Sequence, residues 1–341
     1  MEKPKFFIGI DISAETFDAA VFQENKPVIT AKEPFVNNPD GYGLFCSWLA
    51  SLNINNQNSA MCLEITGAYS ECICYYLHEK GFVVWPEAPH KVHRAFYRQV
   101  KNDKVSAMQI AEYIYRFFDK INPFQPNESI VEQIKTLLAT REQLQKQSTA
   151  SQNILHSIKR KYYQTPLAND ILADTIKNLK SSIDKIDKEL NSLINNNSKF
   201  APIAKALDSI PGIAMLFIAN YIVITDGLTR HMEYKELASY IGICPNEQRS
   251  GTSVYKKPRS SGYGPSRLRK LLNLASKSIK HHNPKFHNYF VLKQAQGKLE
   301  TLIINNIANK LLRIVCAISK NGLTYNKNYT SVHPRFLMQN A

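Results

Sequence analysis

The chain of 341 residues lacks the sequence features of secreted, membrane-spanning and P-loop proteins. Its six cysteines are scattered without zinc-knuckle spacing, so we expect reduced thiols in a cytoplasmic protein. No basic segment followed by an apolar one opens the chain, which predicts no signal peptide. The longest apolar stretch, residues 213–224, contains Asn220 and is too short to span a bilayer. Gly9-Ile10-Asp11 also opens sugar-kinase-like ATPases, but glycine-rich phosphate loops are missing, which disfavours that fold.

Acidic residues are missing from residues 251–290, which are called the basic segment below. Long solvated helices normally mix both signs of charge, so this absence predicts contact with phosphates. The formal net charge of +15 favours nucleic acid over an anionic membrane surface or a merely soluble basic protein. Arg267 and Lys270 share a helix face by their spacing. The residues that we expect at the nucleic acid are Arg249, Lys256, Lys257, Arg259, Arg267, Arg269 and Lys270.

Three carboxylates stand where the local pattern favours other residues. Asp11 ends the apolar run 6–10 and Glu64 ends the apolar run 60–63, so each is expected at the end of a buried strand. A carboxylate there is costly unless a charged group compensates it. Asp103 opens a helical stretch. Hard divalent cations take oxygen ligands, so the three acids predict a site for Mg²⁺, with Mn²⁺ possible. Singly, Asp11 would more simply cap a turn, and Glu64 would begin a helix.

Residues 6–122 have the pattern of an α/β domain, in which two strands come first and strands then alternate with helices. This order suits a mixed sheet covered by helices. The expected strands are 6–12, 16–23, 28–31, 60–64 and 82–85, and the expected helices are 41–52, 69–80 and 103–118.

Glycine is absent from residues 128–197, where apolar residues recur at helical spacing. Ile183, Ile186, Leu190 and Leu193 step by three and four, as in a coiled-coil seam. The stripe predicts an antiparallel hairpin within one chain or, equally, a dimer zipper. Pro166 marks the expected tip of the hairpin.

The remaining chain, residues 200–325, is expected to form a mainly helical unit. Residues 209–213 predict a tight turn between helices, which is either an ordinary connector or a phosphate-binding turn. Residues 245–253 predict a polar loop, in which Ser250 lies between Arg249 and Gly251. Its hydroxyl could attack a phosphate held by the adjacent basic groups, although Ser-Gly steps are common in ordinary loops.

Six short motifs follow one another in a family-specific order. They are Gly9-Ile10-Asp11-Ile12-Ser13, Glu64-Ile65-Thr66-Gly67-Ala68-Tyr69, Lys101-Asn102-Asp103-Lys104, Ser209-Ile210-Pro211-Gly212-Ile213, Tyr240-Ile241-Gly242-Ile243-Cys244-Pro245 and Arg249-Ser250-Gly251. Together they resemble the insertion-sequence-110 family of DEDD transposases, which includes the Piv-type DNA invertases. The resemblance extends from residue 6 to about residue 325.

The resemblance implies an α/β RNase-H-like, RuvC-type N-terminal domain, a helical coiled-coil-like connector and a mainly α C-terminal transposase domain. It implies the domain boundaries 1–125, 126–199 and 200–325, followed by a loose tail, 326–341. By motif, Asp11, Glu64 and Asp103 are the first three metal-binding acids, and Ser250 is the catalytic serine.

Members of the resembled family recombine DNA with the help of a noncoding guide RNA, also called a bridge RNA, that pairs with donor and target DNA. They act as homo-oligomers, dimers or tetramers, in which one subunit's acids meet another's serine. The resemblance therefore predicts a bacterial, nucleoid-associated partner of DNA and RNA, with no role for a membrane.

One position departs from the family pattern. A fourth acid is expected three residues after Asp103, on the same helix face, but this chain has Ser106. A serine hydroxyl can still ligate a metal, but the site loses one negative charge. Two other functions therefore stay open beside a serine recombinase: a catalytically impaired nucleic-acid-binding homologue, and a Mg²⁺-dependent junction nuclease that uses water.

Overall fold

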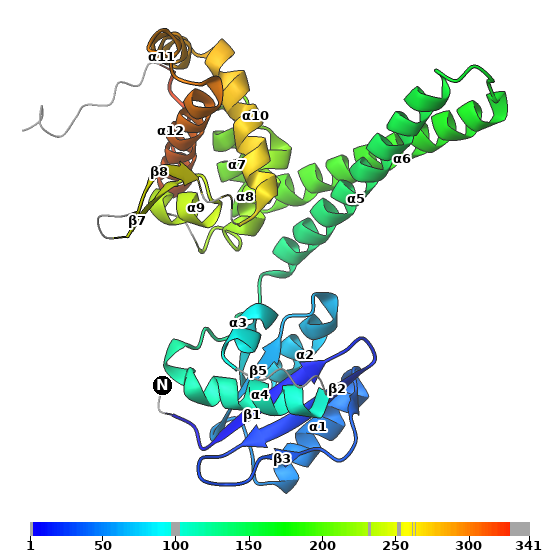
Figure 1. Ribbon diagram of the computed structural model, residues 1–341, viewed down its shortest axis with the longest axis vertical. Helices are drawn as coiled ribbons and strands as arrows, with labels where there is room; N and C mark the ends of the chain where they lie inside the picture. Colours follow the sequence, from blue (N-terminus) through cyan, green and yellow to red (C-terminus); the bar gives the residue numbers. More distant parts are fainter. Residues whose placement is uncertain are drawn as a thin grey trace, which may run out of the picture. The chain divides into compact units, whose positions relative to one another are not determined.

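The computed structural model describes residues 3–96, 103–230, 233–250, 254–260, 262 and 264–327, without the side chains of residues 103, 104 and 246–259. The chain divides into two compact units, Met1–Pro126 and Asn127–Ala341. The expected fold class is confirmed, because a mixed sheet with helices comes first and a mainly helical region follows (Figure 1).

The first unit contains one mixed sheet and its covering helices. Its elements are β1 (Phe6–Ile12), β2 (Thr16–Phe22), β3 (Ile29–Thr30), β4 (Phe35–Val36), α1 (Pro39–Ser51), β5 (Ser59–Glu64), α2 (Ala68–Glu79), β6 (Val83–Glu87), α3 (Pro89–Arg94), α4 (Asp103–Arg116) and a 3₁₀ turn, Phe118–Lys120. The strand order is β3-β2-β1-β5-β6, and β4 also pairs with β2. β1 runs antiparallel to β2 and parallel to β5, and β5 runs parallel to β6, which is the RNase-H-like arrangement.

Alternating side chains of the central strands separate two layers of core. Ile8, Ile10 and Ile12 of β1 pack with the buried faces of α1 and α2. Phe7, the next residue in the alternation, packs instead with Ile110 and other residues of α4 on the opposite face. Figure 1 shows α4 lying across that face of the sheet. Asp11 has the parity of Phe7 and therefore belongs to the α4 face.

The edge strands differ from the expected ones. The strand expected at 28–31 is reduced to β3, and β4 was not expected, because two-residue strands carry no readable periodicity. At the other edge, β6 continues through Pro86 to Glu87 instead of ending at residue 85. There the Phe124 N–H donates to the Val84 carbonyl at 2.7 Å.

The second unit is mainly helical and also contains one β-hairpin. Its elements are α5 (Ser129–Ile158), α6 (Pro166–Asn196), α7 (Phe200–Asp208), α8 (Met215–Ile224), α9 (Tyr234–Tyr240), β7 (Pro245–Ser250), β8 (Val254–Ser260), α10 (Ser266–His282), α11 (Pro284–Ala295) and α12 (Glu300–Asn321). The apolar face of α12 is buried in the core of this unit. In the described part of the chain, α12 alone is long and apolar enough to cross a membrane, and this burial makes it a core helix.

The long helices α5 and α6 form an antiparallel hairpin within one chain, which resolves the alternative left open by the sequence. Ile183 and Leu190 of the expected stripe are buried. Arg141 of α5 donates to both carboxylate oxygens of Asp187 on α6, at 2.6 and 3.0 Å. Pro166, the expected tip marker, is the first residue of α6.

The turn expected at residues 209–213 connects α7 to α8. Ile210 and Ile213 are buried in the core. Gly212 has a φ of +90°, and a Cβ at this position would lie 2.8 Å from the Ala275 carbonyl oxygen of α10. Because the turn packs against α10 in this way, the structure supports the connector interpretation.

Candidate active site and nucleic-acid interface

Asp11 and Glu64 lie on one face of the sheet at the carboxyl ends of neighbouring parallel strands. Ile10 pairs with Leu63 in the register of β1 and β5, so the residues that follow them, Asp11 and Glu64, come at the same level. Asp18 of β2 is the register partner of Asp11 and adds a carboxylate that sequence reasoning missed. Residues in register share a sheet face, so three acids from three strands lie along one edge of the α4 face.

Gly9 sets the position of α4 above these strands. A Cβ on Gly9 would lie 2.1 Å from the Ala107 carbonyl oxygen and 2.2 Å from the Ala111 nitrogen, so only glycine permits this approach. The described part of α4 begins at Asp103, one helical turn before Ala107. Ser106 follows Asp103 by three residues, the spacing at which side chains are expected to share a helix face. Ser106 is half-buried.

The carboxylate of Glu64 is held in a poorly solvated place. Its side chain is 13% exposed, and its Oε1 lies 4.0 Å from Nε2 of His93, which comes from α3. Burial raises the pKa of Glu64, and His93 lowers it in part. An ionised carboxylate in this position is stabilised by a nearby cation.

Glu87 is a second buried acid that the sequence interpretation missed. It is the register partner of Glu64 on β6. Its Oε1 accepts from the Ala88 N–H at 2.8 Å and lies 3.0 Å from Nζ of Lys91, while the Tyr113 hydroxyl donates to its Oε2 at 3.3 Å. Burial, reinforced by Glu87, raises the pKa of Tyr113 to about 12. The signal was available, because Glu87 follows an apolar strand, as Glu64 does.

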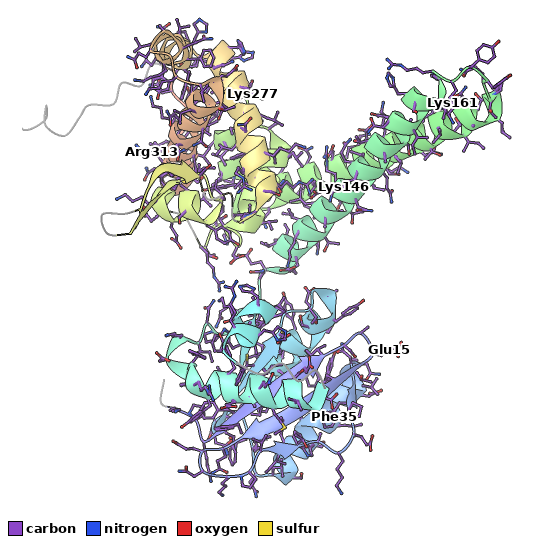
Figure 2. The ribbon with its side chains drawn as sticks, in the orientation of Figure 1. Glu15, Phe35, Lys146, Lys161, Lys277 and Arg313 are labelled. Carbon is purple, nitrogen blue, oxygen red and sulfur yellow. The ribbon has the colours of Figure 1, made fainter. Side chains whose placement is uncertain are left out.

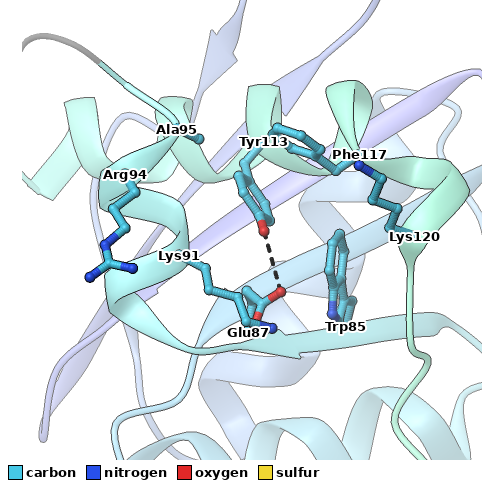
Figure 3. A pocket seen from close by; sticks show the side chains of 8 residues that line it. All are labelled: Trp85, Glu87, Lys91, Arg94, Ala95, Tyr113, Phe117 and Lys120. Atoms are coloured by element: carbon cyan, nitrogen blue, oxygen red, sulfur yellow. Dashed lines mark hydrogen bonds and ion pairs between the residues drawn. The ribbon is translucent and has the colours of Figure 1, made fainter. Parts of the chain in front are cut away.

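A pocket of about 410 Å³ opens beside Glu87 (Figure 3). Trp85 and Tyr113 form an aromatic wall, with ring centroids 5.4 Å apart. Lys91 and Arg94 of α3 and Lys120 bring cations to its lining. Lys91 is already paired with Glu87, and the cations of the lining give the pocket a chemistry suited to an anionic group such as a phosphate.

The residues of this edge fit a hard divalent cation. Asp11 and Glu64 supply carboxylate oxygens, and burial of Glu64 disfavours its charge unless a cation is near. Among the described side chains, which exclude that of Asp103, no group of three His, Cys, Asp or Glu is assembled into a metal cluster. Metal binding by Asp103, whose side chain lies outside this description, stays a prediction.

Ser250 lies at the end of a strand and not in a polar loop, so that expectation was wrong. β7 and β8 form an antiparallel hairpin in which Arg249 pairs with Tyr255 and Ser250 pairs with Val254. Residues 251–253 lie outside the described residues. Lys256, Lys257 and Arg259 lie on β8 of this hairpin, and the structure describes their backbone without their side chains. Both strands consist mainly of consecutive polar residues, so the pair shows no apolar periodicity in the sequence.

Two arginines of the basic segment make contacts inside the second unit. The Arg267 guanidinium, 21% exposed, donates to the Leu138 carbonyl at 2.7 Å and to Glu142 at 2.9 Å, both on α5. Arg269 donates to the Ile241 carbonyl at 2.7 Å. Lys270 is exposed. Nucleic-acid binding by these residues stays a prediction, and the contacts give Arg267 and Arg269 structural roles as well.

All six cysteines are free thiols, as expected.

Comparison with known proteins places the chain in a family. Residues 8–164 match a DEDD family of insertion sequence IS110 described as transposase, and residues 204–291 match the transposase IS116/IS110/IS902 family. The pilin gene-inverting proteins of Moraxella lacunata and Moraxella bovis are each 28% identical over 333 residues, which cover 95% of this chain and 98% of each relative. An uncharacterized protein of insertion element IS110 from Streptomyces coelicolor is 24% identical over 46% of this chain and 38% of its own length.

The two matches span the sheet with its candidate acids and the helical unit with its basic segment. The chain therefore belongs to the IS116/IS110/IS902 family of transposases, enzymes that recombine DNA, and it combines the family's DEDD domain with its C-terminal transposase domain.

Proposed function

We propose that the chain is an RNA-guided DNA recombinase of a bacterial insertion sequence that acts in the cytoplasm, at the nucleoid. In this proposal Asp11, Glu64 and Asp103 hold Mg²⁺ at the scissile phosphate, and Ser250 is the nucleophile. The pilin gene-inverting relatives are named for inverting a gene, which supports DNA strand exchange as the reaction.

The observation that carries the proposal is the placement of Asp11 and Glu64. Two acids end neighbouring parallel strands on one sheet face, and Gly9 brings the helix that begins at Asp103 against that face. A bound divalent cation would supply charge stabilisation for a phosphodiester there. The chain's own residues contribute the ligand oxygens and, through Lys91 and Arg94, cations for flanking phosphates.

The proposed chemistry proceeds in two transfers. The Ser250 Oγ attacks the scissile phosphorus, so a phosphorus–serine bond forms as the bond to the leaving DNA oxygen breaks. The serine proton departs to solvent or to a neighbouring base, and the leaving oxygen gains a proton. A DNA hydroxyl then attacks the same phosphorus and releases serine. The bond energy is kept throughout, so no external energy source is needed.

The guide RNA and the homo-oligomer enter this proposal from the family resemblance. The formal net charge of +15 supports a nucleic acid as the partner. Sequencing the nucleic acid that copurifies with the full chain tests the RNA component directly. Recovery of one discrete RNA with segments complementary to donor and target DNA is expected, and recovery of only random fragments would contradict RNA guidance.

The decisive experiment replaces Ser250 with alanine in the full chain. Recombination and any covalent protein–DNA adduct should disappear, while nucleic-acid binding stays within a few-fold, because only a hydroxyl is lost. Ser260→Ala on the neighbouring strand β8 is the matched control and should keep the adduct. An adduct that persists in the Ser250 variant would move the nucleophile elsewhere, with Ser253 the next candidate.

The same experiment separates the alternative functions. Cleaved DNA without an adduct in the unsubstituted chain would indicate a junction nuclease that uses water. Binding without cleavage would indicate an impaired homologue, and Ser106 in place of the fourth acid is the residue that motivates this outcome.

A further inference from the structure

The far end of the α5–α6 hairpin is a second stretch of the chain that lacks acidic residues. Residues 143–169 contain no Asp or Glu, while they include Lys146 and the run Lys159-Arg160-Lys161-Tyr162-Tyr163. This stretch is separate from the basic segment and comprises the end of α5, the connecting turn and the start of α6. We call residues 159–164 the hairpin tip.

Both tyrosines of the hairpin tip project into solvent. Tyr162 is 91% exposed and Tyr163 is 86% exposed. Their ring centroids are 5.0 Å apart and the ring planes are at 90°. Two neighbouring aromatic rings bury almost nothing here, so they contribute little to folding and present their faces to a partner.

The backbone of the hairpin tip is ordered by local hydrogen bonds. The Arg160 N–H donates to the Ser157 carbonyl at 3.2 Å, and the Lys161 N–H donates to the Ile158 carbonyl at 3.1 Å. The Gln164 amide donates to the Lys159 carbonyl at 3.2 Å and also to the Lys161 carbonyl. The exposed side chains are therefore carried on a defined turn, which lowers the entropy lost when they bind.

The hairpin holds this turn far from the core of its own unit. Leu138 is the last residue of α5 in the core cluster. From there to the end of α5 at Ile158 a helix rises about 30 Å. Lys161, labelled in Figure 2, lies at the far end of the hairpin. A surface at this distance can reach a ligand that does not touch the core.

The positive charge of the hairpin tip favours an anionic partner. Lys159, Arg160 and Lys161 are exposed, and none of them pairs with a carboxylate among the residues that the structure describes. Two such tips would repel one another, which disfavours a contact between identical tips. Tyrosine rings stack on bases of any sequence, and adjacent lysines and arginines bind phosphates.

We propose that the hairpin tip is a separate binding site for unpaired nucleotides, whose bases stack on Tyr162 and Tyr163 and whose phosphates lie on Lys159, Arg160 and Lys161. It rests on the proposed function only in requiring that the chain bind nucleic acid. The shared ligand chemistry is an unstacked nucleotide strand, which either a loop of RNA or a displaced DNA strand supplies. Duplex DNA, whose bases are already stacked, is the poorer ligand.

The test uses the full chain with labelled single-stranded DNA, single-stranded RNA and duplex DNA in separate binding titrations. Tyr162→Ala with Tyr163→Ala should weaken single-strand binding by about tenfold or more, and duplex binding by much less. Lys159→Gln, Arg160→Gln and Lys161→Gln together should flatten the salt dependence on single strands by about two units. Of single-stranded DNA and single-stranded RNA, the one whose affinity falls more in these variants is the source of the unpaired nucleotides.

Matched controls come from the same hairpin. Lys177→Gln, Lys180→Gln and Lys188→Gln remove three exposed charges from α6 among acidic neighbours and should change the salt dependence by much less. Leu167→Ala and Ile171→Ala remove exposed apolar area beside the tip without removing a ring.

Photocrosslinking to single strands followed by mass spectrometry should place a nucleotide adduct on Tyr162 or Tyr163. Unchanged single-strand binding by the tyrosine variant, with no adduct at the tip, would overturn the proposal. A fall in oligomeric mass with unchanged binding would assign the tip to a second copy instead. If the unsubstituted chain bound no nucleic acid, the proposed function itself would fail, which is a different result.

Discussion

Two groups of charged residues look equally anomalous in the sequence, the acids of the first unit and the basic segment of the second, yet the structure treats them differently. The Glu64 side chain is 13% exposed, and its carboxylate lies 4.0 Å from the His93 ring. Arg267 is bonded to Leu138 and Glu142 of α5, more than a hundred residues away. Misplacement in the sequence does not by itself separate a charge used inside the fold from one available to a ligand, because the partners of Arg267 come from a distant part of the chain.

The sharpest version of this comparison lies within the first unit, between Glu64 and Glu87. They are register partners on one sheet face, but Glu87 is bonded to Ala88, Lys91 and Tyr113. Glu64→Gln should lower DNA strand transfer by about a hundredfold or more, because a ligand charge at the proposed metal is lost. Glu87→Gln should mainly lower the free energy of unfolding, by about 1–3 kcal/mol. Strand-transfer rates and urea unfolding of both variants measure the difference.

The pH dependence of stability predicts in which direction a substitution of Glu64 changes the melting temperature. Burial raises the pKa of Glu64, so the folded chain favours the protonated acid, and stability is lost as pH rises through the folded pKa. At pH 7 without divalent metal, Glu64→Gln should therefore unfold at an equal or higher temperature. A lower melting temperature would show that Glu64, like Glu87, has a structural role.

Gly9→Ala should break the arrangement of the acids without touching any of them. The added methyl would lie 2.1 Å from the Ala107 carbonyl oxygen, so α4 must shift. We expect a loss of about 1–3 kcal/mol in stability and of most strand transfer, since Asp103 moves with the helix. Gly43→Ala on α1, where the nearest atom is 3.9 Å away, is the control and should do neither.

Two substitutions in the basic segment distinguish the structural role of Arg267 from the predicted DNA-binding role of Lys270. Arg267→Gln should lower the free energy of unfolding by about 1–2 kcal/mol, because its bonds to Leu138 and Glu142 are lost. Lys270→Gln should leave stability unchanged and flatten the salt dependence of DNA binding by about one unit. Equal salt dependence in the Lys270 variant would mean that this face of α10 does not contact phosphate.

Ser106→Asp should have the smallest effect, a rise of several-fold. Spacing puts residue 106 on the helix face of Asp103, so an acid there would add a negative charge at the proposed metal. The Mg²⁺ concentration that gives half-maximal strand transfer should fall, and the rate should rise. If the Asp variant needs no less Mg²⁺ and is no faster, residue 106 is not near the metal.

The sequence predicted the central strands and long helices of the first unit well, because Phe6–Ile12 and Ser59–Glu64 are apolar runs of strand length. It failed where periodicity was absent. The hairpin β7–β8 is built from polar residues, β4 has two residues, and α3 has six. Asp11 and Glu64 were predicted as site acids from their misplacement in apolar runs, whereas Asp18 was recognised only from the register of β1 and β2.

The edges of the sheet bear on how copies of this protein can meet. At one edge β3 and β4 have two residues each. At the other, β6 carries Pro86, which has no N–H to offer, and its Val84 carbonyl already accepts from Phe124. Short, proline-containing or covered edges resist strand addition by another chain. Strand addition between two copies of this sheet is therefore disfavoured at both edges, so any contact between copies would have to use other surfaces than the ends of the sheet.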